Sequence, residues 1–180
     1  MGANQWFLGS ETEFLLLSVE IDNKLAYWRQ MKPKRLRSKL ANVNFGQDVV
    51  IVEPVNLYKC DLGDGVRVGP FTEIQAGVQV GKRTKIQSHS FICSKVSIGE
   101  DCFIGHGVMF INDLLRDGPA AGDQNKWRDT VIGNSVSIGS NATILPVSIC
   151  DNTVIGAGSV VTKDINEPGI YAGNPAKRIR

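Results

Sequence analysis

Aliphatic residues recur at every sixth position through the middle of the chain. The series consists of Leu62, Val68, Ile74, Val80, Ile86, Ile92, Ile98 and Ile104, and Phe110 continues it. A second small or aliphatic residue follows four positions after most of these: Val66, Thr72, Val78, Thr84, Ser90, Val96, Cys102 and Val108. A period of six matches neither the repeat of an α-helix nor the alternation of a lone amphipathic strand. It predicts a solenoid in which each hexapeptide supplies one short strand and one turn.

Three hexapeptides close one triangular coil, so the aliphatic positions point inward and stack from coil to coil. Glycine often follows the aliphatic position, as in Val80-Gly81 and Ile104-Gly105, and suits turns where φ is positive. Stacked coils lie about 4.8 Å apart, as neighbouring strands do. The pattern therefore predicts an all-β solenoid, a left-handed parallel β-helix. A β-sandwich is disfavoured, because its strands would recur at about 8–12 residues.

The repeat stops after Phe110 and resumes at Ile132. The polar, glycine-bearing residues 111–130 between them predict one long loop, and a long loop inside a compact repeat is often functional. The later series consists of Ile132, Ile138, Ile144, Ile149, Ile155 and Val161, in which the single step of five predicts a shortened turn. We expect the β-helix to span residues 46–167 and a C-terminal tail to occupy 168–180.

Residues 1–45 are expected to form an N-terminal appendage. Ser10 to Glu13 fits a capping box. The apolar residues that follow at steps of three and four are Phe14, Leu17, Ile21, Leu25 and Trp28. This spacing favours an amphipathic helix, although Phe14 to Val19 would equally suit a strand. The favoured interpretation is a helical cap without a catalytic role.

Charge and composition exclude several classes of protein. The net charge of +2 is too small to indicate a nucleic-acid partner, and the basic run from Lys32 to Lys39 is interpreted as solvated. No apolar run approaches the roughly 20 residues of a membrane span. Residues 1–10 lack the layout of a signal peptide. The four cysteines contain no Cys-x-x-Cys pair, which favours reduced structural thiols and a cytoplasmic protein.

With this repeat in place, the chain resembles the hexapeptide acyltransferases from about Asp61 to its C-terminus. Ile86 to Cys93 and Gly105 to Asp113 are similar to enzymes that N-acetylate nucleotide-linked 3-amino-3-deoxy sugars for bacterial surface polysaccharides. Residues 156–164 and 172–177 are similar to segments shared across the wider superfamily, and they imply the use of acetyl-CoA. The resemblance thus implies a dTDP- or UDP-linked amino sugar as the acceptor.

The same resemblance implies a homotrimer with its active sites between neighbouring subunits and acetyl-CoA along the groove. It implies that Asn112 holds the acceptor amine. Gly139 and Ala157 are expected to contact acetyl-CoA in that groove. Lys163 and Lys177 are candidate partners for its phosphates, since Lys and Arg suit phosphate recognition, but each would equally be a solvated lysine.

The chemistry of acetyl transfer to an amine selects further candidates. Holding the amine beside the thioester is itself worth several kcal/mol, and an asparagine oxygen can orient it. His89 and His106 are the only two histidines and so the natural bases near neutral pH. At eighteen residues per coil they share one corner on adjacent coils, and Asn112 and Asp113 lie at the next. Each histidine would otherwise only bond within its turn, and Asp113 is either a base or a turn-shaping residue.

Other candidates carry less chemistry. Residues 125–128 (Asn125, Lys126, Trp127 and Arg128) offer charge and an aromatic face that would contact substrate or pack the loop, and packing is favoured slightly. Cys102 is not expected to be a nucleophile, because its register points it into the core. No metal is expected, since a β-helix hydratase needs three histidine ligands for zinc. Two alternatives stay open: an O-acetyltransferase acting on a sugar or serine hydroxyl, and a non-catalytic β-helix that serves assembly or binding.

Overall fold

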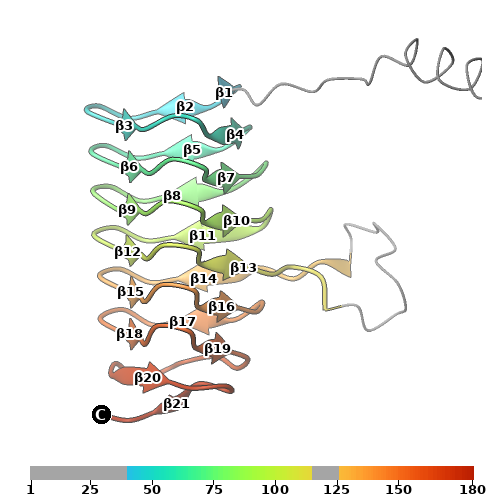
Figure 1. Ribbon diagram of the computed structural model, residues 1–180, viewed down its shortest axis with the longest axis vertical. Helices are drawn as coiled ribbons and strands as arrows, with labels where there is room; N and C mark the ends of the chain where they lie inside the picture. Colours follow the sequence, from blue (N-terminus) through green and yellow to red (C-terminus); the bar gives the residue numbers. More distant parts are fainter. Residues whose placement is uncertain (1–39, 115–125) are drawn as a thin grey trace, which may run out of the picture. The chain divides into compact units, whose positions relative to one another are not determined.

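The computed structural model describes residues 40–114 and 126–180, and these form a left-handed parallel β-helix (Figure 1). The fold predicted from the six-residue period is therefore confirmed. The helix expected at residues 10–28, the basic run at 32–39 and Asn125 lie outside the described residues. Within the described part of the chain, no helix is long and apolar enough to cross a membrane.

The described strands form three sheets, which make the three faces of the coil. Sheet A contains, in spatial order, β1 (Leu40–Ala41), β4 (Asn56–Tyr58), β7 (Glu73–Ile74), β10 (Phe91–Ile92), β13 (Met109–Phe110), β16 (Thr143–Ile144) and β19 (Val160–Val161). Sheet B contains β2 (Asn44–Phe45), β5 (Asp61–Leu62), β8 (Gln79–Val80), β11 (Val96–Ile98), β14 (Thr130–Ile132) and β17 (Ser148–Ile149). Sheet C contains β3 (Val50–Ile51), β6 (Arg67–Val68), β9 (Lys85–Ile86), β12 (Phe103–Ile104), β15 (Ser137–Ile138), β18 (Val154–Ile155), β20 (Ile170–Ala172) and β21 (Lys177–Arg178).

Neighbouring coils stack in parallel register, so each inward side chain lies on its counterpart in the next coil. Ile92 pairs with Ile74, and Phe110 pairs with Ile144. These aliphatic and aromatic positions are fully buried and form one continuous core. The turn shortened between Ile144 and Ile149 changes only the residue count of its coil, because the inward positions still stack there.

Polar residues at the second inward position are accommodated by bonds to the next coil. The Ser90 hydroxyl donates to the carbonyl of Gly105 at 2.9 Å, and the Thr84 hydroxyl donates to the carbonyl of Gly99 at 2.9 Å. Since a buried hydroxyl without a partner is costly, these bonds explain why serine and threonine can replace valine at this position.

Both ends of the ladder extend beyond the expected limits of 46 and 167. β1 begins at Leu40 and pairs with β4 in register. At the other end β20 adds to β18 in parallel, and β21 turns back on β20 antiparallel within residues 168–180. The antiparallel pair interrupts the repeat at its C-terminal end, where a further parallel coil would otherwise add.

Three corners join the sheets, and we name each by what it carries. The histidine corner leads from sheet C to sheet A and comprises residues 52–55, 69–72, 87–90, 105–108, 139–142 and 156–159. The asparagine corner leads from sheet A to sheet B and includes residues 75–78, 93–95, 111–114, 126–129, 145–147 and 162–164. The charged corner leads from sheet B to sheet C and comprises residues 46–49, 63–66, 81–84, 99–102, 133–136 and 150–153.

Candidate functional site

The two histidines share the histidine corner on adjacent coils, as the residue count predicts. Ser88 Oγ lies 2.9 Å from His106 Nδ1. The backbone N–H of Gly107 donates to the carbonyl of Ser88 at 3.0 Å, which fixes the two turns against each other. Both histidine side chains are exposed. The corner therefore presents a serine–histidine pair to solvent.

The Ser88 contact decides which nitrogen of His106 can act on a ligand. With Nδ1 occupied by the serine hydroxyl, Nε2 is the nitrogen available for proton transfer. If Nδ1–H donates to Ser88 Oγ, Nε2 is an acceptor and has the form that a base requires. Substitution of Ser88 would remove this orientation.

Asn112 lies at the asparagine corner, where the long loop leaves sheet A. Its Nδ2 donates to the backbone carbonyl of Ser94 in the preceding coil at 3.2 Å. The N–H of Arg128, on the returning side of the loop, donates to the carbonyl of Asn112 at 3.3 Å. Because a carbonyl can only accept, the amide group facing Ser94 is the NH₂, and within the described part of the chain Oδ1 is left to accept from a ligand.

A chain of hydrogen bonds continues from Ser94 away from Asn112. Ser94 N and Oγ both face Gln75 Oε1, at 3.2 and 3.4 Å. Gln75 Nε2 in turn donates to Glu73 Oε1 at 3.1 Å. Sequence reasoning missed Gln75, Ser94 and Glu73, because their connection runs between coils and leaves no local motif. The chain ties the orientation of Asn112 to a carboxylate on the outer face of sheet A.

The predicted site residues are divided between two corners. His89, His106, Gly139 and Ala157 lie at the histidine corner, and Asn112, Asp113 and Lys163 lie at the asparagine corner. Lys177 lies on β21, at neither corner. Lys163 is exposed and lies two coils beyond Asn112. Asp113, which follows Asn112 in the chain, is half-buried. The corners are the two margins of sheet A, so within one subunit the two groups stay apart.

The first glycines of the histidine-corner turns, Gly69, Gly105 and Gly139, are required by the close approach of coils. A Cβ on Gly139 would lie 2.8 Å from the Cα of Ala157 and 2.8 Å from the carbonyl carbon of Gly156, both in the next coil. Stacking by itself is thus enough to require glycine at position 139. Ala157, by contrast, is exposed at a turn.

The loop residues on the returning side pack against the coils. Lys95 Nζ donates to the carbonyl of Trp127 at 2.8 Å. The indole nitrogen of Trp127 is buried and has no hydrogen-bond partner within the described part of the chain. Lys126 and Arg128 are exposed.

The charged corner holds a ladder of ion pairs with a structural role. Arg83 contacts Asp101 at 2.7 Å and Glu100 at 3.0 Å, and Lys82 contacts Asp64 at 3.0 Å. Hydrogen bonding to Arg83 lowers the pKa of Asp101, and the backbone N–H of Gln47 with Lys82 lowers that of Asp64. Both carboxylates therefore remain charged and paired, which suits the alignment of coils and not proton transfer.

The cysteines lie in or near the core. Cys102 is buried, as its register predicts, and its thiol donates to the carbonyl of Gly133 at 3.1 Å. Burial raises the pKa of Cys102 and raises that of Cys93 to about 12. A thiol with a raised pKa is a poor nucleophile. Among residues 40–114 and 126–180, no cluster of three His, Cys, Asp or Glu side chains is placed to hold a metal ion.

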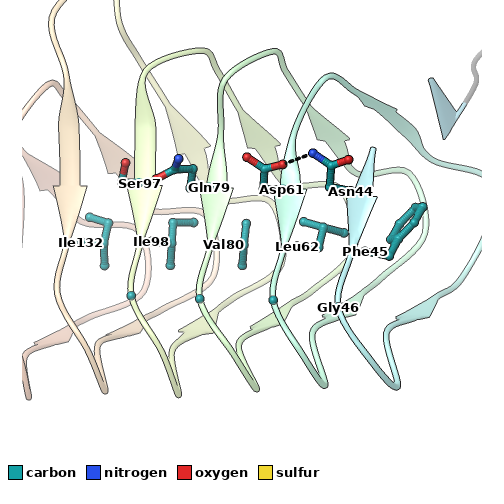
Figure 2. Close-up of a pocket in the computed structure, with 13 residues that line it drawn as sticks. Asn44, Phe45, Gly46, Asp61, Leu62, Gln79, Val80, Ser97, Ile98 and Ile132 are labelled. Atoms are coloured by element: carbon teal, nitrogen blue, oxygen red, sulfur yellow. Dashed lines mark hydrogen bonds between the residues drawn. The ribbon is translucent and has the colours of Figure 1, made fainter. Parts of the chain in front are cut away.

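An open groove of about 530 Å³ follows the outer face of sheet B. Figure 2 shows a row of polar side chains along it, from Asn44 through Asp61 and Gln79 to Ser97. Asn44 Nδ2 donates to Asp61 Oδ1 at 2.6 Å, so the carboxylate is already paired. The groove contains none of the predicted site residues.

Two family models match this chain. The bacterial transferase hexapeptide (six repeats) matches residues 59–94, and the hexapeptide repeat of succinyl-transferase matches residues 95–109 and 129–163. Together they cover coils on either side of the long loop. The matched residues include the histidine corner at His89 and His106.

Individual proteins are similar over parts of their length. The bifunctional protein GlmU of Streptococcus uberis is 31% identical over 78% of this chain, and the alignment spans 32% of GlmU. The chloramphenicol acetyltransferase of Agrobacterium fabrum is 38% identical over 48% of this chain and 51% of its own. The chain thus spans about a third to a half of these curated relatives.

A solved structure supports the fold. A point mutant of AntD, an N-acyltransferase from Bacillus cereus in complex with dTDP and coenzyme A, superimposes with a TM-score of 0.65 and 23% identity. The superposition covers 79% of this chain and 84% of AntD. This superposition shows the shared fold. The two hexapeptide family models, together with the aligned relatives, show that the chain belongs to the hexapeptide acyltransferase family.

Proposed function

We propose that this protein is an acetyl-CoA-dependent N-acetyltransferase that acts on the amino group of a nucleotide-linked sugar. The acceptor is a 3-amino-3-deoxy sugar linked to dTDP or UDP, on the route to a surface polysaccharide. The observation that carries the proposal is Asn112, whose amide NH₂ is anchored on Ser94 while Oδ1, among residues 40–114 and 126–180, remains to accept a hydrogen bond. AntD, an N-acyltransferase bound to dTDP and coenzyme A, is consistent with these substrate classes.

The orientation of Asn112 suits an amine acceptor. An N–H of the neutral amine donates to Oδ1, and the nitrogen lone pair then points away from the asparagine toward the thioester. The amine nitrogen attacks the carbonyl carbon, the C–S bond breaks, and the sulfur of CoA leaves as the thiol with the proton that the nitrogen loses. Since a neutral amine is already a good nucleophile, positioning contributes more than a strong base.

A homotrimer would complete the site. Asn112 and Lys163 lie along the asparagine corner, and His106 and Ala157 lie along the histidine corner of the same sheet. In a threefold arrangement the histidine corner of one subunit faces the asparagine corner of the next, which brings the site residues of the two corners together. Acetyl-CoA would lie along the groove between these two subunits, with its phosphates near Lys163 and its pantetheine beside Ala157. The roles of His89, Gly139, Asp113 and Lys177 belong to the same proposal.

The Ser88–His106 pair favours a second candidate, an O-acetyltransferase. A hydroxyl is a weak nucleophile and needs a base, and Nε2 of a histidine whose Nδ1 is held at 2.9 Å by Ser88 can supply one. The two candidates differ in which corner is indispensable. Transfer to an amine depends on Asn112, and transfer to a hydroxyl depends on His106.

The test is a thiol-release assay on the purified protein with acetyl-CoA. The acceptors are dTDP- and UDP-linked 3-amino and 4-amino sugars, with hydroxyl acceptors alongside. We expect CoA release with an amino sugar, and a fall in kcat/KM of about 100-fold in Asn112→Ala, the usual effect of losing one well-placed hydrogen-bonding group. Acetyl-CoA affinity should change little.

Matched variants separate positioning from folding. Asn112→Asp keeps an acceptor oxygen but loses the bond to Ser94, so it should be nearly as impaired as Asn112→Ala. Asn44→Ala removes one side-chain hydrogen bond on sheet B and should retain activity. Full activity in Asn112→Ala would remove Asn112 from the mechanism. If CoA is released only with hydroxyl acceptors, and this release is lost in His106→Asn, the protein is the O-acetyltransferase instead.

A further inference from the structure

Phe71 occupies an unusual place at the histidine corner. Its φ is +60°, in the left-handed region, where the matching turn positions hold His89, Gly107, Asn141 and Gly158. A bulky aromatic residue with positive φ is uncommon and strained. The side chain nevertheless stays 59% exposed, so burial in the core does not compensate for the strain. Strain of this kind concentrates at functional sites.

The Phe71 ring is held by a neighbour. It stacks on the His89 ring with centroids 4.8 Å apart and planes 29° apart. The backbone N–H of Phe71 donates to the carbonyl of Pro54 at 2.5 Å, which fixes the turn on the preceding coil. With one face covered by His89 and most of its area exposed, the ring offers its other face to a ligand. A fixed, exposed aromatic face is a stacking platform for a planar ring.

A cavity of about 280 Å³ opens beside this ring, and we call it the Phe71 pocket. It is lined by Pro54, Val55, Asn56, Phe71, Thr72 and Glu73. Asn56 and Glu73 are direct partners on adjacent strands of sheet A, so an amide and a carboxylate stand side by side at its polar wall. A carboxylate accepts from a ring N–H, and the neighbouring amide NH₂ donates to a ring carbonyl. The volume suits a single ring system.

The Phe71 pocket is linked to the candidate catalytic asparagine within one subunit. Glu73 accepts from Gln75, which contacts Ser94, whose carbonyl anchors Asn112. This path crosses two coil steps, about 10 Å along the solenoid axis, and also the width of sheet A from the histidine corner to the asparagine corner. A diphosphate and a sugar ring can span such a distance.

We infer that the Phe71 pocket binds the base of the nucleotide that carries the acceptor sugar. The base stacks on Phe71, with its imide N–H toward Glu73 and a carbonyl toward Asn56, and the diphosphate runs over the outer face of sheet A toward Asn112. Uracil and thymine have the required N–H between two carbonyls, whereas adenine lacks a ring carbonyl. The inference rests on the proposed function, because it requires a nucleotide-linked acceptor.

Calorimetric titration of the full chain with UDP, dTDP and ADP tests this assignment. We expect Phe71→Ala to weaken UDP and dTDP binding about 10-fold, within the roughly 5- to 150-fold range of a lost base–aromatic stack. Phe71→Trp should restore binding. Glu73→Gln should reduce the preference for UDP over ADP. The affinity for acetyl-CoA should be the same in all variants.

The matched control is Phe103→Ala, which removes another exposed aromatic residue on sheet C, outside the Phe71 pocket. It should bind UDP and dTDP as the wild type does. Wild-type nucleotide affinity in Phe71→Ala would overturn the inference and leave the proposed function intact. A Phe71→Ala protein that changes its assembly state by light scattering and keeps its nucleotide affinity would show a subunit contact instead. If the wild type binds no nucleotide, the inference and the nucleotide-linked acceptor both fail.

Discussion

Two glycines in one coil allow the spacing between coils to be tested. A Cβ on Gly81 would lie 2.5, 2.6 and 2.7 Å from three backbone atoms of Gly99 and Glu100 in the next coil. Gly77, four residues earlier, has a φ of +80° but no heavy atom within 4 Å of its added Cβ. Gly81→Ala therefore probes crowding between coils, and Gly77→Ala probes backbone conformation alone.

The structure sets the size of each effect. Ordinary contact begins at 3.4 Å, so relief at Gly81 requires the next coil to move by nearly an ångström against backbone that cannot rotate away. That movement would stretch the bond from Gly81 N to the carbonyl of Ile98, now 2.8 Å. Overpacking of a tight interior costs about 1–3 kcal/mol, and we expect the upper end. Gly77→Ala should lower the free energy of unfolding by about 1 kcal/mol, because the left-handed conformation is unfavourable for alanine. The reduced conformational freedom of the unfolded chain offsets part of this loss.

Thermal unfolding followed by circular dichroism measures the difference. For a chain of this size about 1 kcal/mol corresponds to about 2–4 °C in Tm, so Gly81→Ala should lower Tm by roughly 6–12 °C and Gly77→Ala by roughly 2–4 °C. Protein concentration must be constant, since assembly makes Tm concentration-dependent. Equal losses in the two variants would refute the argument that coil contact dictates glycine at this position.

Three further outcomes follow from the core and the charged corner. Phe110→Ala should lower the free energy of unfolding in urea by about 3–5 kcal/mol, since the ring is fully buried, and a loss under about 1 kcal/mol would contradict this. Ellman's reagent at about pH 8 should label the half-buried Cys150 before Cys93, whose pKa burial raises to about 12; equal rates in the folded protein would be inconsistent. Arg83 lowers the pKa of Asp101, so their pairing stabilises the fold at pH values above the unfolded pKa of about 3.9 and is lost as the pH falls through the lower folded pKa. Arg83→Ala should therefore flatten the acid side of the curve of unfolding free energy against pH, and an unchanged acid side would argue against the pairing.

The ends of the solenoid show where pattern reading fails. Leu40 pairs with Leu57, and Asn44 with Asp61, seventeen residues apart, so the first coil is out of step with the period of eighteen. Its inward residue Phe45 also remains half-exposed. Among the described residues, a terminal coil has a neighbouring coil on one side only, so its sequence is less constrained by stacking, and the six-residue pattern fades before the ladder ends.

Within the coils, local repetition was enough to determine the fold. Every hexapeptide places the same position inward, so Ile74, Ile92 and their equivalents could be assigned to the core without knowledge of any distant contact. Counting eighteen residues per coil also placed His89 and His106 at one corner and Asn112 at the next.

The contacts that orient the candidate site were decided only by the tertiary structure. Which atom of Ser88 meets His106, and which end of the Asn112 amide faces Ser94, depend on side-chain geometry between coils. The stacking of Phe71 on His89 likewise joins residues eighteen apart through a strained turn. A period records which way a side chain points, because that follows from the backbone. It does not record which partner the side chain meets, because that partner belongs to another coil and the choice is made by packing and hydrogen bonding between them.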